Sequence, residues 1–100
     1  MPISKQWQSS TKDRIQSRVP EKPGVYELKA FGEFVYIGSS QNLQRRLLEH
    51  EEERNPNEFR FESMGFFEQL LSSPAKLERE HYDRYIQKYG EPPSWNQKTP

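Results

Sequence analysis

A β-hairpin predicted between residues 24 and 38 constrains the fold of this chain more than any other sequence feature. Two runs rich in β-branched and aromatic residues, Gly24–Lys29 and Glu33–Gly38, are separated by only three residues. The last of these three is Gly32, and a glycine in the left-handed conformation commonly closes a three-residue hairpin loop. Two adjacent antiparallel strands are therefore expected here.

The three-residue loop also predicts the register of this hairpin. It pairs Lys29 with Glu33 as opposite charges, and it pairs Tyr26 with Tyr36. Because side chains alternate between the two faces of a strand, a slip of one residue would separate the two tyrosines. The predicted register places both phenol rings side by side on one face.

A carboxylate on the apolar side of the last predicted helix is the second informative feature. This helix is expected from Pro74 to Tyr89, because Ser73 can cap its start and Gly90 can end it. At about 100° per residue, Glu78 falls within the apolar, aromatic face, whereas Glu80 falls on the solvated face. A buried carboxylate is costly without a cation, a metal or hydrogen-bond donors. Glu78 is therefore a candidate functional residue, with a structural ion pair as the alternative.

A helix predicted from the Asn42 cap to about Arg54 carries two adjacent arginines in different environments. Arg46 lies beside His50 at the border of a loose apolar stripe, whereas Arg45 falls on the solvent side. We expect Arg46, and not Arg45, to lean over the sheet.

The remaining segments complete a prediction of one α+β domain. Residues 58–62 alternate between polar and aromatic side chains, which predicts a third strand, and 66–71 suit a short helical turn. Residues 1–22 are polar and slightly basic, with a short helix expected near 11–18. We predict a three-stranded antiparallel sheet flanked by helices over residues 23–96, preceded by this N-terminal segment and followed by a tail at 97–100.

Composition excludes several classes of protein. The 100 residues hold 15 Lys and Arg against 15 Asp and Glu, so no overall positive charge attracts nucleic acid or a membrane surface. The absence of cysteine excludes disulfides, thiol nucleophiles and cysteine-bearing zinc sites. No apolar run is long enough to span a membrane, and no apolar signal-peptide core is present. An intracellular, cytoplasmic protein is expected.

Packing of the predicted helices onto the sheet would bring together Tyr26, Tyr36, Arg46 and Glu78. A lone carboxylate with hydroxyl or amide neighbours suits a hard cation such as Mg²⁺ rather than Zn²⁺. An adjacent arginine can hold a phosphate oxygen and stabilise the charge of a transition state. A phenol can position or deprotonate water, although its reference pKa near 10 requires help from nearby positive charge. These parts suit phosphodiester hydrolysis.

The same residues resemble the motifs of the GIY-YIG nuclease superfamily. Gly24-Val25-Tyr26 is similar to the first motif, with Val in place of the usual Ile, and Tyr36-Ile37-Gly38 matches the second without change. Arg46, eight residues past that glycine and followed by Leu, is similar to the catalytic arginine of the family. Leu77-Glu78 resembles its metal-binding glutamate, and Asn96 its closing asparagine. The resemblance covers about three quarters of the chain.

This resemblance implies a metal-dependent endonuclease that hydrolyses DNA phosphodiester bonds with Mg²⁺ or Mn²⁺ held by Glu78. It makes Tyr26 the candidate general base, Tyr36 a residue that orders water or phosphate, and Arg46 a residue that stabilises transition-state charge. Three further residues are expected to line the nucleic-acid site or support it: Gly38, His50 and Asn96. The expected partner is nucleic acid, with DNA favoured.

Two departures from the family keep other functions open. Ser39 stands where the family often has a lysine, which removes a phosphate-binding cation. Residues 49–62 contain six acidic residues against two arginines, which makes a poor surface beside DNA. The alternative is a non-catalytic or partner-dependent module that binds nucleic acid or protein on the same fold. A homodimeric enzyme is a third hypothesis.

Overall fold

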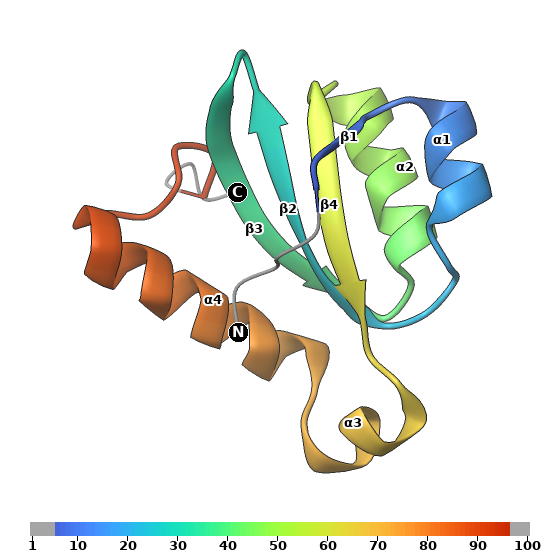
Figure 1. Cartoon of the computed structure of the whole chain (residues 1–100), viewed down its shortest axis with the longest axis vertical. Helices are drawn as coiled ribbons and strands as arrows, with labels where there is room; N and C mark the ends of the chain where they lie inside the picture. The colour runs from blue at the N-terminus through green and yellow to red at the C-terminus, as the bar shows by residue number, and fades with distance from the viewer. Residues whose placement is uncertain (1–5, 97–100) are drawn as a thin grey trace.

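An antiparallel sheet with helices on both faces forms the protein, as seen in a computed structural model that describes residues 6–96 (Figure 1). The predicted tail at 97–100 and the start of the N-terminal segment, residues 1–5, lie outside the described residues. In chain order the elements are β1 (Gln8–Ser9), α1 (Lys12–Arg18), β2 (Gly24–Ala30), β3 (Glu33–Ser40), α2 (Leu43–Glu53), β4 (Glu58–Ser63), α3 (Phe66–Leu71) and α4 (Pro74–Tyr89). The α+β class and its flanking helices agree with the prediction.

The sheet has four strands rather than the predicted three, in the order β1-β4-β2-β3. The extra strand is β1, which pairs Gln8 with Phe59 and Ser9 with Glu58 of β4. A strand of two residues is too short to show the alternation by which strands are recognised in a sequence. It nonetheless covers part of the outer edge of β4, which leaves β3 as the other edge of the sheet.

The predicted hairpin forms, but its register differs from the prediction. The turn has two residues rather than three, because Phe31 and Gly32 both adopt positive φ angles of 53° and 77°, as in a type I′ turn. A β-bulge between Leu28 and Lys29 then adds one residue on β3. Tyr26 therefore pairs with Gly38 instead of Tyr36.

The same correction applies to the rest of the hairpin. Lys29 pairs with Phe34, not with Glu33, and Leu28 pairs with Tyr36. At Tyr26 the register has shifted by two residues, and a shift of two returns each side chain to its original face. The expected side-by-side placement of the tyrosines is therefore preserved as a diagonal contact.

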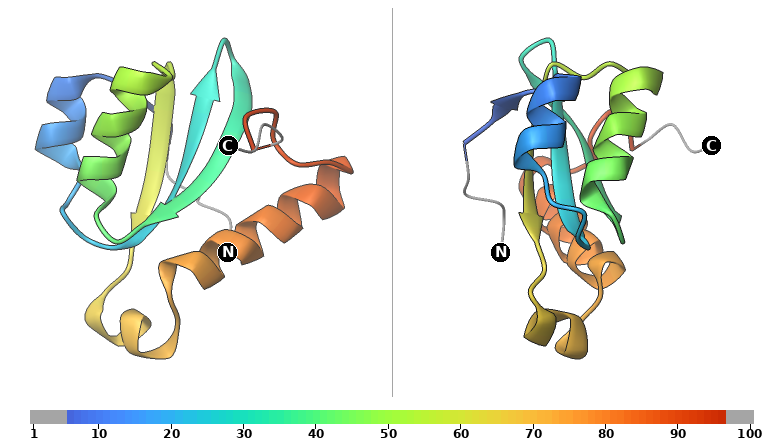
Figure 2. Two further views of the ribbon diagram at one scale, coloured as in Figure 1. Left: turned by 180° about the vertical axis from the view of Figure 1, so that it is seen from behind. Right: turned by 90° about the vertical axis from the view of Figure 1, so that its right-hand side faces the viewer.

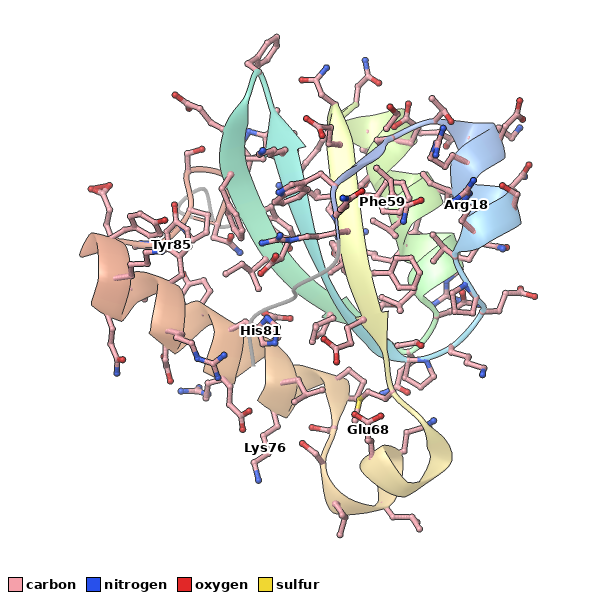
Figure 3. All side chains as sticks on the ribbon, in the orientation of Figure 1. Arg18, Phe59, Glu68, Lys76, His81 and Tyr85 are labelled. Atoms are coloured by element: carbon pink, nitrogen blue, oxygen red, sulfur yellow. The ribbon has the colours of Figure 1, made fainter. Side chains whose placement is uncertain are left out.

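Helices α1 and α2 pack on one face of the sheet, and α4 crosses the other (Figures 1 and 2). The core lies mainly between the sheet and helices α1 and α2, where Phe59 of β4 is fully buried (Figure 3). Ile15 and Val19, from the polar N-terminal segment, belong to this same core. Helix α1 is thus part of the folded core, packed beside α2.

The predicted limits of α2 and α4 agree with the structure, because capping residues define where these helices begin or end. The Asn42 side chain accepts a hydrogen bond from the backbone N–H of Arg45 at 3.0 Å and caps α2. Ser73 caps α4 in the same way, and Gly90 ends it with a φ angle of 87°. In the part of the chain that the structure describes, no helix combines the length and apolar character needed to cross a membrane.

The packing of α1 predicts that the N-terminal segment contributes to stability. Replacing Ile15, whose side chain is fully buried, with Ala should lower the free energy of unfolding by about 2–4 kcal/mol, since it leaves a cavity. The exposed neighbour Gln16 provides the control, and Gln16→Ala should change stability by less than about 0.5 kcal/mol. Urea unfolding measures both variants. Equal stabilities would show that α1 does not belong to the folded core.

Candidate active site

The site is built around Tyr26, whose side chain is only 1% exposed. Its hydroxyl lies 2.7 Å from Nε2 of His50, a buried residue of α2. Its ring lies against Gly38, the residue opposite it on β3. A Cβ atom at Gly38 would stand 2.5 Å from both the hydroxyl oxygen and Cζ of Tyr26, and 2.7 Å from the Tyr36 ring. Glycine at this position is thus required for the two phenols to lie over β3.

Tyr36 lies beside Tyr26 and His50 on the same face of the sheet. Its ring centroid is 6.0 Å from that of Tyr26 and 5.2 Å from that of His50. The guanidinium of Arg54, at the end of α2, lies 5.2 Å from the Tyr36 ring centroid. Tyr36 is half-buried, so this phenol is more accessible than that of Tyr26.

Arg46 extends from α2 to the Tyr26 hydroxyl, while Arg45 is exposed, as the helical pattern predicted. Its Nη1 atom also lies 3.0 Å from Oε1 of Glu49 and 3.9 Å from Oε1 of Glu53. The side chain of Arg46 is 36% exposed, so these ion pairs are open to solvent and can exchange for another anion. The acidic residues on α2 therefore partly neutralise this arginine.

Glu78 reaches the site from α4, on the opposite side of the sheet. Its Oε1 atom accepts a hydrogen bond from the Ser39 hydroxyl at 2.6 Å, and it forms no ion pair with Arg46. Among residues 6–96, no hydrogen bond reaches its Oε2 atom. Glu78 is half-buried and lines a surface groove together with Arg79 and Asn96.

Electrostatic interactions link several of these groups. Burial raises the pKa of the Tyr26 phenol above its usual value, the neighbouring Tyr36 phenol adds to this rise, and Glu78 makes the smallest contribution. Arg46 opposes this rise through its positive charge and a hydrogen bond to the phenol. Burial also lowers the pKa of His50 to about 4, helped by Arg46 and Arg54. His50 is therefore neutral at pH 7, and Tyr26 keeps its proton.

Tyr26, Tyr36 and Arg46 lie together on the α2 side of the sheet, and Glu78 lies across β3 from them, close enough for its charge to act on the Tyr26 phenol. These four predicted residues are here called the four-residue cluster. His50 contacts both phenols of this cluster. The Nδ1 atom of His50 is buried and has no hydrogen-bond partner among the described residues. These contacts place His50 inside the site rather than at its border.

Asn96 binds the backbone of the edge strand. Its Oδ1 atom accepts a hydrogen bond from the Ile37 N–H at 2.9 Å, and its Nδ2 group donates one to the Ile37 carbonyl at 3.0 Å. The preceding residue, Trp95, donates its own backbone N–H to the Val35 carbonyl at 2.9 Å. The segment after α4 is thereby attached along β3, and Asn96 holds this edge next to Gly38.

Similarity to known proteins agrees with this arrangement. A family model described as "Domain of unknown function (DUF7508)" matches residues 1–84. Among solved structures, a point mutant of the GIY-YIG N-terminal endonuclease domain of UvrC from Thermotoga maritima, bound to its catalytic divalent cation, has a TM-score of 0.54 and 26% sequence identity. That match covers 85% of this chain and 97% of the other. The chain belongs to the DUF7508 family and to the GIY-YIG superfamily.

Curated relatives of this GIY-YIG domain are much longer proteins. The UvrABC system protein C of Aquifex aeolicus is 45% identical over 38 residues, which is 38% of this chain and 7% of the relative. The protein of the same name from Thermosipho africanus is 56% identical over 32 residues, which is 32% of this chain and 6% of the relative. The matches therefore concern a short segment of these relatives. At the level of the family, this fold is that of a nuclease domain.

The side chains that could bind a metal in this GIY-YIG domain fit a divalent cation held by one carboxylate. Within the described part of the chain, no group of three or more His, Cys, Asp or Glu side chains is arranged around a metal position. Mg²⁺ commonly uses one or two carboxylates and keeps several waters. Glu78, with Oε2 unbonded and a groove beside it, satisfies this requirement.

Sequence reasoning missed two partners in this site. Ser39 was considered only as the loss of a cation, yet its hydroxyl orients the Glu78 carboxylate. Glu49 counts in the sequence analysis only as one of the acidic residues of 49–62, yet it pairs with Arg46. The second contact had a signal, because residues three apart on a helix are neighbours. The first had none, because it joins two elements whose packing the sequence does not define.

The contact at Gly38 yields a stability prediction. Gly38→Ala should lower the free energy of unfolding by about 1–3 kcal/mol, because the new methyl group overlaps both phenols. Gly65→Ala is the control, since its nearest atom would be 3.5 Å away, and it should cost less than about 1 kcal/mol. Chemical denaturation measures both. A Gly38 variant as stable as the wild type would contradict the close contact.

The buried His50 predicts a loss of stability in mild acid. In the unfolded chain His50 binds a proton near its usual pKa of 6.5, whereas in the folded protein it does so only near pH 4. Lowering the pH through this window therefore favours the unfolded state, by about 1–3 kcal/mol. His50→Asn should reduce this pH dependence. An NMR titration in which His50 of the folded protein changes charge near pH 6.5 would contradict the assignment.

Proposed function

We propose that this GIY-YIG domain is a divalent-metal-dependent endonuclease that hydrolyses DNA phosphodiester bonds. The observation that supports it best is the four-residue cluster, in which two phenols and a guanidinium lie together on one side of β3 and a carboxylate lies across the strand, within electrostatic range. The charges are complementary to a phosphate that carries a bound cation. The Thermotoga maritima domain of the same fold is bound to a catalytic divalent cation.

Arg46 is the residue that would bind the scissile phosphate. Its present partners, Glu49 and Glu53, are solvent-exposed carboxylates, so their hold on the guanidinium is weak. A phosphate oxygen that replaces Glu49 would receive a charge-assisted hydrogen bond, and the guanidinium would stabilise the charge that develops in the transition state.

Glu78 would hold the cation through its carboxylate, with Ser39 fixing the orientation of Oε1. Such a cation supplies Lewis-acid assistance to a phosphate oxygen and lowers the pKa of adjacent water. The groove beside Glu78 would provide space for the water molecules that complete its coordination.

The two tyrosines would position the attacking water and accept its proton. Tyr36, the more accessible phenol, would order this water or a phosphate oxygen. Tyr26 would serve as the proton acceptor only after its own proton is lost, and its raised pKa opposes that loss in the free protein. The neutral His50, 2.7 Å from the hydroxyl, would hold the phenol in position by a hydrogen bond.

A second function is favoured by one specific observation. Glu49 and Glu53 partly neutralise Arg46, the arginine on which phosphate binding depends. A module that binds nucleic acid weakly, or acts only with a partner, would show this feature. Binding of DNA that falls with salt, without cleavage under any metal condition, would favour this function over an enzyme.

A cleavage assay with a matched variant tests the proposal. The wild type should nick plasmid or flapped DNA in the presence of Mn²⁺, and Glu78→Gln should reduce the rate by about 100-fold, because its amide no longer carries a charge for the cation. Glu80→Gln, on the exposed side of the same helix, should cleave as the wild type does. Equal cleavage by the Glu78 variant would refute the assignment and indicate contamination.

A further inference from the structure

The face of the sheet that α4 covers holds a buried polar cluster outside the nuclease site. Glu27 follows Tyr26 on β2 and therefore points to the opposite face, where it is 3% exposed. Its Oε1 atom accepts a hydrogen bond from Nε of Arg60, the residue opposite it on β4, at 2.6 Å. Its Oε2 atom lies 3.7 Å from Nδ1 of His81, a residue of α4 that is 5% exposed.

This cluster forms the floor of a pocket of about 200 Å³ between the sheet and the second half of α4. One wall is aromatic and apolar, formed by Phe34, Ile37 and Tyr85, with the two ring centroids 5.0 Å apart. The other is cationic, because Arg84 and Lys88 line the pocket from the same side of α4. Figure 3 shows His81 and Tyr85 on the side of α4 that faces the sheet.

Two nitrogen atoms in this pocket are buried without a hydrogen-bond partner among the described residues. They are Nδ1 of His81 and Nη1 of Arg84. Buried polar atoms in native proteins are nearly always paired, and an unpaired guanidinium nitrogen is particularly costly. The His81 nitrogen faces the Glu27 carboxylate at 3.7 Å, so the Arg84 guanidinium is the group that a ligand with acceptor oxygens would satisfy.

The charges determine which kind of ligand fits. Glu27 already pairs with Arg60, so the pocket's carboxylate is compensated. Arg84 and Lys88 then leave the lining with a positive excess, which favours an anion. A volume of about 200 Å³ accommodates one ring and one acidic group.

We propose that this pocket binds a small aromatic carboxylate. Its ring packs on Phe34 and Tyr85, and its carboxylate accepts a hydrogen bond from the Arg84 guanidinium, with His81 at the base of the pocket. The site is independent of the four-residue cluster, which lies at the β3 edge and uses the Glu78 end of α4.

Benzoate is the probe for this proposal, with two small molecules that separate its features. Benzylamine keeps the ring but reverses the charge, and acetate keeps the carboxylate without the ring. In NMR titrations of the full chain at constant ionic strength, benzoate should shift the His81 and Tyr85 signals saturably at millimolar concentrations or below. Benzylamine should cause no saturable shift, and acetate should bind at least about tenfold more weakly.

Variants test the residues that carry the proposal. Arg84→Met keeps the length of the side chain and removes its charge, and it should weaken benzoate binding at least about tenfold. Lys76→Met is the matched control, since Lys76 is an exposed cation of the same helix outside the pocket, and should bind benzoate as the wild type does (Figure 3). Glu78→Gln should also bind benzoate as the wild type does. A failure of the nuclease proposal can therefore be distinguished from a failure of this one.

Four results would overturn the proposal. The first is the absence of a saturable shift at His81, and the second is equal binding of benzoate and benzylamine. The third is benzoate-induced shifts centred on Arg46 and Tyr36, which would place the carboxylate at the nuclease site. Wild-type affinity in the Arg84 variant would equally contradict the role of its guanidinium.

Discussion

The close contact between the Tyr26 ring and the backbone of Gly38 organises the rest of the site. Because Gly38 has no side chain, the phenol lies over the edge strand and its hydroxyl reaches His50 at 2.7 Å. The same space admits the Tyr36 ring beside it. Any larger residue on β3 would displace both phenols, and with them the contact to Arg46. The absence of a side chain at Gly38, rather than a polar interaction, thus determines where the polar groups lie.

Alternation along β2 divides the molecule into two chemical environments. Tyr26 faces the core under α1 and α2, whereas Glu27 faces α4 and its buried ion pair with Arg60. Helix α4 serves both environments, since Glu78 near its start reaches the β3 edge through Ser39 and His81 lies over Glu27. A domain of this size can therefore hold the proposed nuclease site and a separate anion pocket without sharing residues.

Much of this fold could be predicted because its signals are local. The limits of α4 follow from Ser73, Pro74 and Gly90, each of which acts within one turn of the chain. The different positions of Arg45 and Arg46 follow from helical geometry alone. The two tyrosines share a face even though the register was wrong, because the error was an even number of residues.

The parts that could not be predicted depend on contacts between distant segments. The bulge after Leu28 and the two-residue strand β1 have no pattern of their own, since both are selected by the partner strand. The Ser39 contact to Glu78 depends on how α4 crosses the sheet. Glu27 did have a signal, as the one acidic residue between apolar neighbours on β2, and comparison with Arg60 in the alternating strand could have found its partner.

The most direct test of the proposed metal site is the anomalous diffraction of a crystal soaked in Mn²⁺. We expect one anomalous peak bonded to the Glu78 carboxylate, at the β3 edge beside Ser39. A Glu78 carboxylate that keeps only its Ser39 hydrogen bond, with manganese absent or bound elsewhere, would contradict it.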